Sequence, residues 1–195
     1  MPFDVNAARS LAAGVFPPAG DRWAHARATA RQAEHVASVV GPSDRETLVC
    51  AAWLHDVGMA AGAARTGFRP LDGALLLRAA GWPDPVVALV AHQCEARITA
   101  EVLGLGPELD AFARPAGPVS DALVFADLAA GPDGHRTSLR DRLAALDTRY
   151  RDEGEAMVEA WVRRRPELVA AAARTEQRLA GARRGRGRDD TFATS

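Results

Sequence analysis

Cysteine is scarce in this chain of 195 residues, and long apolar runs are absent. The only thiols are those of Cys50 and Cys94, which excludes a disulfide framework and favours a reducing compartment. No apolar segment reaches the roughly eighteen residues of a membrane span. The first residues also lack the basic stretch and apolar run of a secretory leader. We therefore expect a cytoplasmic protein with no membrane partner.

Net charge is also missing, because 24 basic side chains stand against 25 acidic ones. Such a balance provides no global electrostatic field toward nucleic acid, so a nucleic-acid partner is not expected. Alternation of apolar and polar residues with period two is missing as well, and no internal repeat is visible. These absences leave one fold class, an all-α protein.

The chain divides into a lead-in at 1–20, one helical domain at 21–180, and a basic tail at 181–195. The tail has charge and glycine but no apolar period, and we expect it to be disordered. Glycine and proline punctuate the remainder. The predicted helices are 6–13, 21–40, 43–58, 70–80, 83–95, 96–103, 107–112, 119–129, 138–151, 155–165 and 166–180.

The stretch 43–58 organises the domain because its middle, residues 48–54, is apolar on every side. A helix of this kind must be surrounded by other helices. Ser43 and Glu46 have the spacing of a capping box, and Gly58 provides a stop. The helix ends in adjacent His55 and Asp56. An imidazole and a carboxylate at the end of a buried helix are costly unless they are paired or bound to a metal ion.

Three more polar side chains occupy predicted apolar helices: His25, Asp127 and His92. His25, His55, Asp56 and Asp127 would make a mixed nitrogen and oxygen set suited to manganese, iron or zinc. Such an ion lowers the pKa of a bound water, which is the usual route to hydrolysis of a phosphate ester. The alternatives are a core histidine for His25, an arginine ion pair for Asp127, and a helix C-terminal imidazole for His92.

The motifs R-W-A-H, A-A-W-L-H-D-V-G and L-V-F-A-D resemble the HD-domain superfamily of metal-dependent phosphohydrolases. Its pattern is a first His, a central His-Asp pair and a final Asp. The stretches T-G-F-R-P-L-D-G-A, G-W-P-D-P-V-V-A-L-V-A-H and A-D-L-A-A-G-P-D-G are similar to a group of actinobacterial HD-domain proteins of unassigned substrate. The resemblance implies an HD-type helical bundle and a metal bound by His25, His55, Asp56 and Asp127.

The resemblance also implies roles for further side chains. Arg22 would lie near the substrate, and His92 beside the metal as a proton-transfer group or extra ligand. The chain departs from the family pattern at three positions: Met59 stands in place of a lysine, while Arg69 and Gln93 replace histidines found in members with two metals. We therefore expect one ion, with Arg22 and Arg69 as the candidate phosphate-binding cations, although both could be plain surface arginines.

The function expected from these residues is hydrolysis of a small phosphate ester, such as a nucleotide, with Asp56 and His92 as catalytic groups. Two alternatives belong to other classes. One is an HD-type iron oxygenase, which would need further metal ligands; the presence of Arg69 and Gln93 argues against it. The other is a non-catalytic module that binds a metal or nucleotide for regulation, with Met59 marking lost chemistry.

Overall fold

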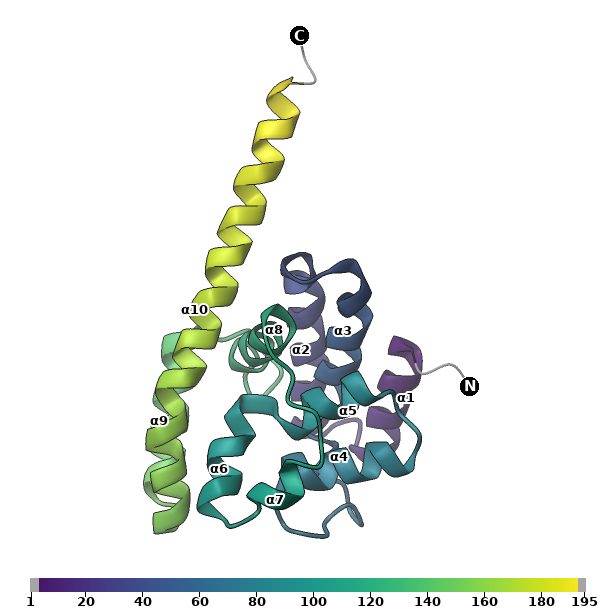
Figure 1. The fold of residues 1–195 in the computed structure, drawn as a ribbon, viewed down its shortest axis with the longest axis vertical. Coiled ribbons are helices and arrows are strands. Elements are labelled where there is room, and N and C mark those ends of the chain that lie inside the picture. The colour runs from purple at the N-terminus through teal and green to yellow at the C-terminus, as the bar shows by residue number, and fades with distance from the viewer. Residues whose placement is uncertain (1–3, 193–195) are drawn as a thin grey trace.

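The computed structural model describes residues 4–192, and within that range the fold is helical (Figure 1). The one β contact in this part of the chain is an isolated bridge between Ala130 and Arg136. The all-α prediction is thus confirmed. The elements in order are α1 (Val5–Val15), α2 (Asp21–Val36), η1 (Ala37–Val39), η2 (Pro42–Asp44), α3 (Arg45–Leu54), η3 (Val57–Met59), α4 (Arg69–Ala79), α5 (Asp84–Ala91), η4 (Gln93–Glu95), α6 (Ala96–Val102), α7 (Gly106–Leu109), α8 (Pro118–Leu128), α9 (Leu139–Arg151) and α10 (Glu155–Phe192).

Helix α3 is central, as its apolar sequence predicts. All of its residues from Leu48 to Leu54 are buried, and it packs against α1, α2, α5 and α8. The expected capping box does not form. Ser43 belongs to the 3₁₀ turn η2, and α3 begins only at Arg45 without a side-chain cap. Pro42 starts that separate turn, so α3 begins later than its sequence predicts.

The lead-in contributes to the core, because α1 packs against α3 and buries Ala8 and Ala12 completely. A second apolar cluster gathers where α8, α9 and α10 meet, with Leu128, Leu143 and Trp161 among its members. Helix α8 therefore lies between the two clusters. None of the described helices is both long and apolar enough to cross a bilayer.

Helix α10 passes through Pro166 without a break, so the two helices expected at 155–165 and 166–180 are one. An interior proline costs about 3 kcal/mol by removing a hydrogen bond and crowding the preceding turn. Trp161 and Leu168 lie on either side of it and pack into the same cluster. This shared packing holds the two segments in line.

The expected disorder at 181–195 is replaced by helix as far as Phe192, and residues 193–195 lie outside the described range. In Figure 1 the last part of α10 extends past the other helices. Glycine lowers helix propensity by about 1 kcal/mol per residue. A helix that is already nucleated continues more easily than a new one begins, which accounts for the difference from the composition-based expectation.

Candidate metal centre

His25 is oriented by a backbone carbonyl at the far side of its ring. The side chain is buried on α2, and its Nδ1–H donates to the carbonyl oxygen of Gly131 at 3.1 Å. Because a carbonyl can only accept, Nδ1 carries a proton, and Nε2 faces the interior. This Nε2 lies 2.9 Å from Oδ1 of Asp127.

His55 is held in the same way at the end of α3. Its Nδ1–H donates to the carbonyl oxygen of Ala52 at 2.9 Å, while its Nε2 is buried with no hydrogen-bond partner in the described structure. The two imidazole rings lie edge to face, 5.1 Å between centroids. Two histidines whose Nδ1–H groups are anchored on backbone, with both Nε2 atoms facing one centre, form a typical arrangement around a metal ion.

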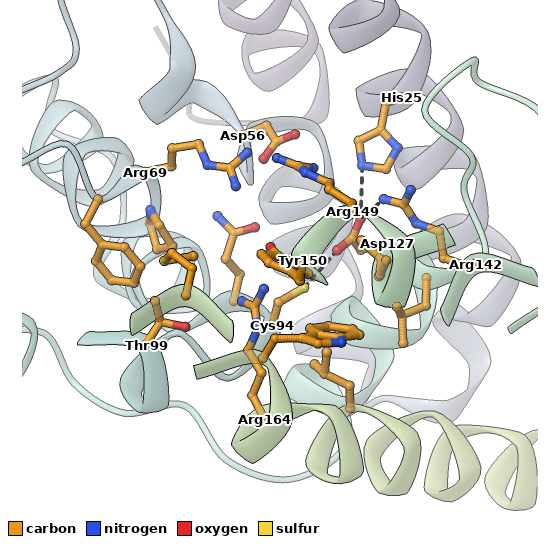
Figure 2. A pocket seen from close by; sticks show the side chains of 18 of the residues that line it. His25, Asp56, Arg69, Cys94, Thr99, Asp127, Arg142, Arg149, Tyr150 and Arg164 are labelled. Carbon is orange, nitrogen blue, oxygen red and sulfur yellow. Dashed lines mark hydrogen bonds and ion pairs between the residues drawn. The ribbon is translucent and has the colours of Figure 1, made fainter. Parts of the chain in front are cut away.

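The two carboxylates approach the histidines from different helices. Oδ2 of Asp56, just after α3, lies 3.6 Å from Nε2 of His55, and Oδ1 of Asp127, on α8, lies 3.9 Å from the same nitrogen. Ligand atoms of His25, His55 and Asp56 all lie within 4.8 Å of one another. Three of the four predicted ligands thus form one group, and Asp127 lies beside both histidines without being a member of it. Figure 2 shows His25, Asp56 and Asp127 around this point.

The protonation states agree with a cluster built for positive charge. Burial would raise the pKa of Asp127, but the hydrogen bond and charge of His25, with His55 and Arg142, hold it below the ordinary value. The pKa of Asp56 is also lowered, since the nearby histidines outweigh burial. Burial acts to lower the pKa of His25, and the hydrogen bond and charge of Asp127 raise it overall. Both carboxylates are therefore ionised at neutral pH.

The residues present fit a divalent ion. Two ligands each about 2.1 Å from a shared ion lie about 3.0 to 3.4 Å apart, and the separations of 2.9, 3.6 and 3.9 Å bracket that range. The orphaned Nε2 of His55 is a second indication, because a buried lone pair without a donor is costly. Among the described residues, His25, His55 and Asp56 are the one such group.

A cavity of about 170 Å³ opens beside the cluster, and five arginines line it: Arg22, Arg69, Arg142, Arg149 and Arg164. Asp56 and Asp127 are the only carboxylates among the described residues that line it. His55 is not part of the cavity wall, so it contacts the cluster from the protein interior. The cavity is therefore strongly basic next to a pair of carboxylates.

Both arginines expected at the site line the cavity. Nη1 of Arg22 pairs with Oδ2 of Asp56 at 3.1 Å, and its side chain is 39% exposed. Nη1 of Arg69 lies 3.4 Å from the sulfur of Met59, so the residue that replaces the family's lysine packs beside an arginine. Arg69 also helps to lower the pKa of Asp56.

The structure does not bring His92 to the cluster, contrary to the prediction. Its Nε2–H donates to the carbonyl oxygen of Phe112 at 3.1 Å, and it is not among the residues of the cavity wall. Burial lowers the pKa of His92, and the nearby charges are those of Arg114, Asp110 and Glu95. The ring therefore faces the segment after α7.

Cys94 reaches the cluster although no sequence motif predicts it there. Its Sγ–H donates to Oδ2 of Asp127 at 2.8 Å, and burial raises the pKa of the thiol well above its ordinary value. Cys94 and Glu95 both have left-handed backbone, with φ of 48° and 55°. This conformation costs about 1 to 3 kcal/mol at each non-glycine residue. The kink turns Cys94 toward Asp127.

Three arginines of the cavity were not predicted from the sequence: Arg142, Arg149 and Arg164. The first two stand seven residues apart on α9 and thus on one helical face, which is a signal that the sequence contains. Nη2 of Arg142 lies 3.9 Å from Oδ1 of Asp127. No sequence signal indicates that Arg164 on α10 would face the same cavity.

Comparison with protein families matches residues 22–146 to the HD domain. Comparisons with curated proteins and with solved structures find no match. The matched range is more than half of the chain and contains all four residues of the cluster, His25, His55, Asp56 and Asp127. The chain belongs to the HD domain family.

Proposed function

We propose that this protein is a metal-dependent phosphohydrolase that acts on a small phosphate ester. The observation that supports it best is the group of His25, His55 and Asp56, with Asp127 beside both histidines, at the edge of a cavity lined by arginines. Carboxylates and imidazoles suit a divalent cation, while guanidinium groups suit phosphate oxygens. Membership of the HD domain family supports the same class of reaction.

His25, His55, Asp56 and Asp127 would hold one ion of manganese, iron or zinc. When bound, the ion would supply Lewis-acid chemistry, acidifying a water ligand and drawing charge from the phosphate. The histidines are ready for this role, because each Nδ1–H is committed to a carbonyl and each Nε2 faces the centre. The sulfhydryl of Cys94 holds the second oxygen of Asp127, which leaves Oδ1 turned to the histidines.

The remaining residues bind phosphate and place water. Arg22 and Arg69 lie on the cavity wall near Asp56, where their guanidinium groups can grip phosphate oxygens. Asp56 is ionised and can accept a hydrogen bond from the attacking water. The reaction adds that water to phosphorus, breaks the bond to the ester oxygen, and releases an alcohol and inorganic phosphate. His92 takes no part, because its ring is bonded to Phe112.

A nucleotide is one member of this substrate class, but the cavity has no free stacking platform among its described residues. Tyr150, Trp161 and Phe68 line it. The rings of Tyr150 and Trp161 stack on each other at 4.8 Å between centroids, and none of the three residues is more than 7% exposed. The proposal therefore depends on recognition of phosphate and not on recognition of a base.

The test combines elemental analysis of the purified protein with a phosphate-release screen over a panel of phosphomonoesters. On any ester that is hydrolysed, Arg22→Ala and Arg69→Ala should each lower kcat/KM by about tenfold to a hundredfold, since a charge-assisted contact contributes about 1.5 to 3 kcal/mol. Metal content should not change. Arg27→Ala, which removes an exposed arginine from the same helix as Arg22, is the matched control.

Two results would overturn the proposal. One is metal-loaded protein that releases no phosphate from any ester of the panel. The other is parental kcat/KM in both Arg22→Ala and Arg69→Ala, which would remove the proposed anion site.

A further inference from the structure

The cavity has more positive charge than one phosphate group can use. Five arginines and two carboxylates line it, an excess of three positive charges before any ion is bound. A phosphate monoester carries about −1.5 to −2 near neutral pH. A divalent ion would add to the excess, so a single phosphate would leave several cations uncompensated.

The five arginines differ in whether they have a carboxylate partner. Arg22 and Arg142 each have a carboxylate neighbour, at 3.1 and 3.9 Å. Within the described part of the chain, Arg149 and Arg164 form no salt bridge with a carboxylate. They come from α9 and α10, whereas the metal cluster is built by α2, α3 and α8. In Figure 2 Arg164 lies on the opposite side of the cavity from His25 and Asp56.

Aromatic rings position these two arginines. The guanidinium carbon of Arg164 lies 4.8 Å from the ring centroid of Tyr150 and 5.3 Å from that of Trp161, and that of Arg149 lies 5.7 Å from Tyr150. A guanidinium that stacks on a ring keeps its N–H groups free to donate in the plane. The stacked pair of Tyr150 and Trp161 thus acts as a support for two cations.

Some polar atoms of the cavity wall have no partner among the described residues. Nε of Arg164 and Oγ1 of Thr99 are buried and have no hydrogen-bond partner in the described structure, and both residues line the cavity. Thr99 is only 1% exposed. A buried donor without an acceptor is costly, typically about 1 to 3 kcal/mol. An anion in the cavity could supply an acceptor to such a donor.

We propose that Arg149, Arg164 and Thr99 form a second phosphate subsite, and that the substrate is a small molecule with two phosphate groups. This inference rests on the proposed function, because the first phosphate is the one at the metal cluster. The second phosphate binds at the α9 and α10 side and is not cleaved. The cavity of about 170 Å³ suits a small molecule in preference to a polymer.

The test is calorimetric titration of Mn²⁺-loaded protein with alkanediol bisphosphates of two to six carbons and with the matching alkyl monophosphates. The parent should bind the best-fitting bisphosphate at least about tenfold more tightly than its monophosphate. Arg149→Gln and Arg164→Gln should each remove most of this advantage, that is, the tighter binding of bisphosphate over monophosphate. Each should change the affinity for monophosphate by less than about threefold. Arg140→Gln removes an exposed arginine from α9 and should leave the advantage intact.

Thr99→Val keeps the test valid if loss of Arg164 disturbs the fold. The substitution preserves shape and removes a hydroxyl without a partner, so thermal stability should be unchanged or higher. Bisphosphate binding should weaken several-fold and monophosphate binding should not. Equal binding of bisphosphate and monophosphate by the parent, or an unchanged advantage in all three variants, would overturn the subsite.

Phosphate release from the same ligands separates this inference from the proposed function. Hydrolysis of monophosphates without any preference for bisphosphates would overturn the subsite and retain the phosphohydrolase. A bisphosphate preference in binding without any hydrolysis would retain the subsite and overturn the phosphohydrolase.

Discussion

Gly58 lies where the turn after the His-Asp pair meets the first turn of α4. A Cβ atom at this position would overlap the carbonyl oxygen of Arg69 and lie 2.6 Å from the backbone nitrogen of Gly73. Both contacts are to backbone, which cannot rotate away as a side chain would. Gly58→Ala must therefore push η3 and α4 apart by roughly 1 Å to restore ordinary contact distances.

The expected loss of stability follows from close packing. Overpacking of a well-packed interior typically costs about 1 to 3 kcal/mol, occasionally more. Because backbone is contacted on both sides, we expect Gly58→Ala to lower the free energy of unfolding by about 3 kcal/mol or more. That is a large part of the roughly 5 to 15 kcal/mol that stabilises a typical domain. For a chain of this length the melting temperature should fall by roughly 6 to 12 °C.

Urea unfolding of the parent and two alanine variants measures this effect. Gly14 lies inside α1, and a Cβ atom added there would have nothing within 4 Å. Gly14→Ala should therefore stabilise the protein by about 0.5 to 1 kcal/mol. The two substitutions are chemically identical and should have opposite signs. A Gly58→Ala midpoint equal to that of the parent, beside the expected gain in Gly14→Ala, would refute the packing argument.

Two other predictions concern the ion and a structural carboxylate. Mn²⁺ at about a hundred times its Kd should add about 2.7 kcal/mol of stability and raise Tm by roughly 5 to 10 °C. A chelator should reverse this gain, and the His55→Gln variant should not show it. An unchanged Tm in protein shown to contain the ion would contradict a buried site. Asp121 accepts hydrogen bonds from Arg174 and Arg178 at 2.6 to 3.0 Å, which hold its pKa low despite burial. Its contribution is present above the unfolded carboxyl pKa of about 3.9 and is lost as pH falls through the lower folded value. Asp121→Asn should therefore lower the free energy of unfolding by about 1 kcal/mol at pH 7, with solvent screening of the half-exposed arginines included. The difference in unfolding free energy between parent and variant should close below about pH 4. A difference that persists at about pH 2 would contradict the pairing.

Local sequence was sufficient to predict the helices that carry the cluster. The apolar run at residues 48–54 can be satisfied only by burial, and the structure buries all of it. His25, His55, Asp56 and Asp127 could be found because each is a polar side chain in an apolar helix, where burial without a partner is costly. In the structure the histidines pair with Asp56 and Asp127, as that cost requires.

The identity of the residue next to Asp127 could not be predicted in this way. The left-handed backbone at Cys94 and Glu95 turns the chain after α5. His92, at the C-terminal cap of α5, faces Phe112, whereas Cys94, within the kink, reaches Asp127. Such a kink has no local sequence signal, because both residues ordinarily avoid this conformation.

Packing of helices that are distant in the sequence determines the remaining differences between the structure and the predictions made from the sequence. Pro166 normally ends or kinks a helix, yet Trp161 and Leu168 join one cluster across it. Whether Arg149 and Arg164 face the cavity depends on how α9 and α10 lie against α8 and α6, and this is a tertiary property. Amphipathic arginine-rich helices of this kind indicate only which residues share a face.

The range matched by the HD domain ends at residue 146, between the two parts of the cavity. The metal cluster, Arg22 and Arg69 lie inside that range, whereas Arg149 and Arg164 lie beyond it. Asp121 on α8 pairs with Arg174 and Arg178, which follow Arg164 along α10. Since α8 also carries Asp127, this ion-pair network fixes the outer arginines relative to the cluster. On the proposed function, the family core would provide the groups for chemistry at one phosphate, and the two C-terminal helices would provide the groups that select what else the substrate carries.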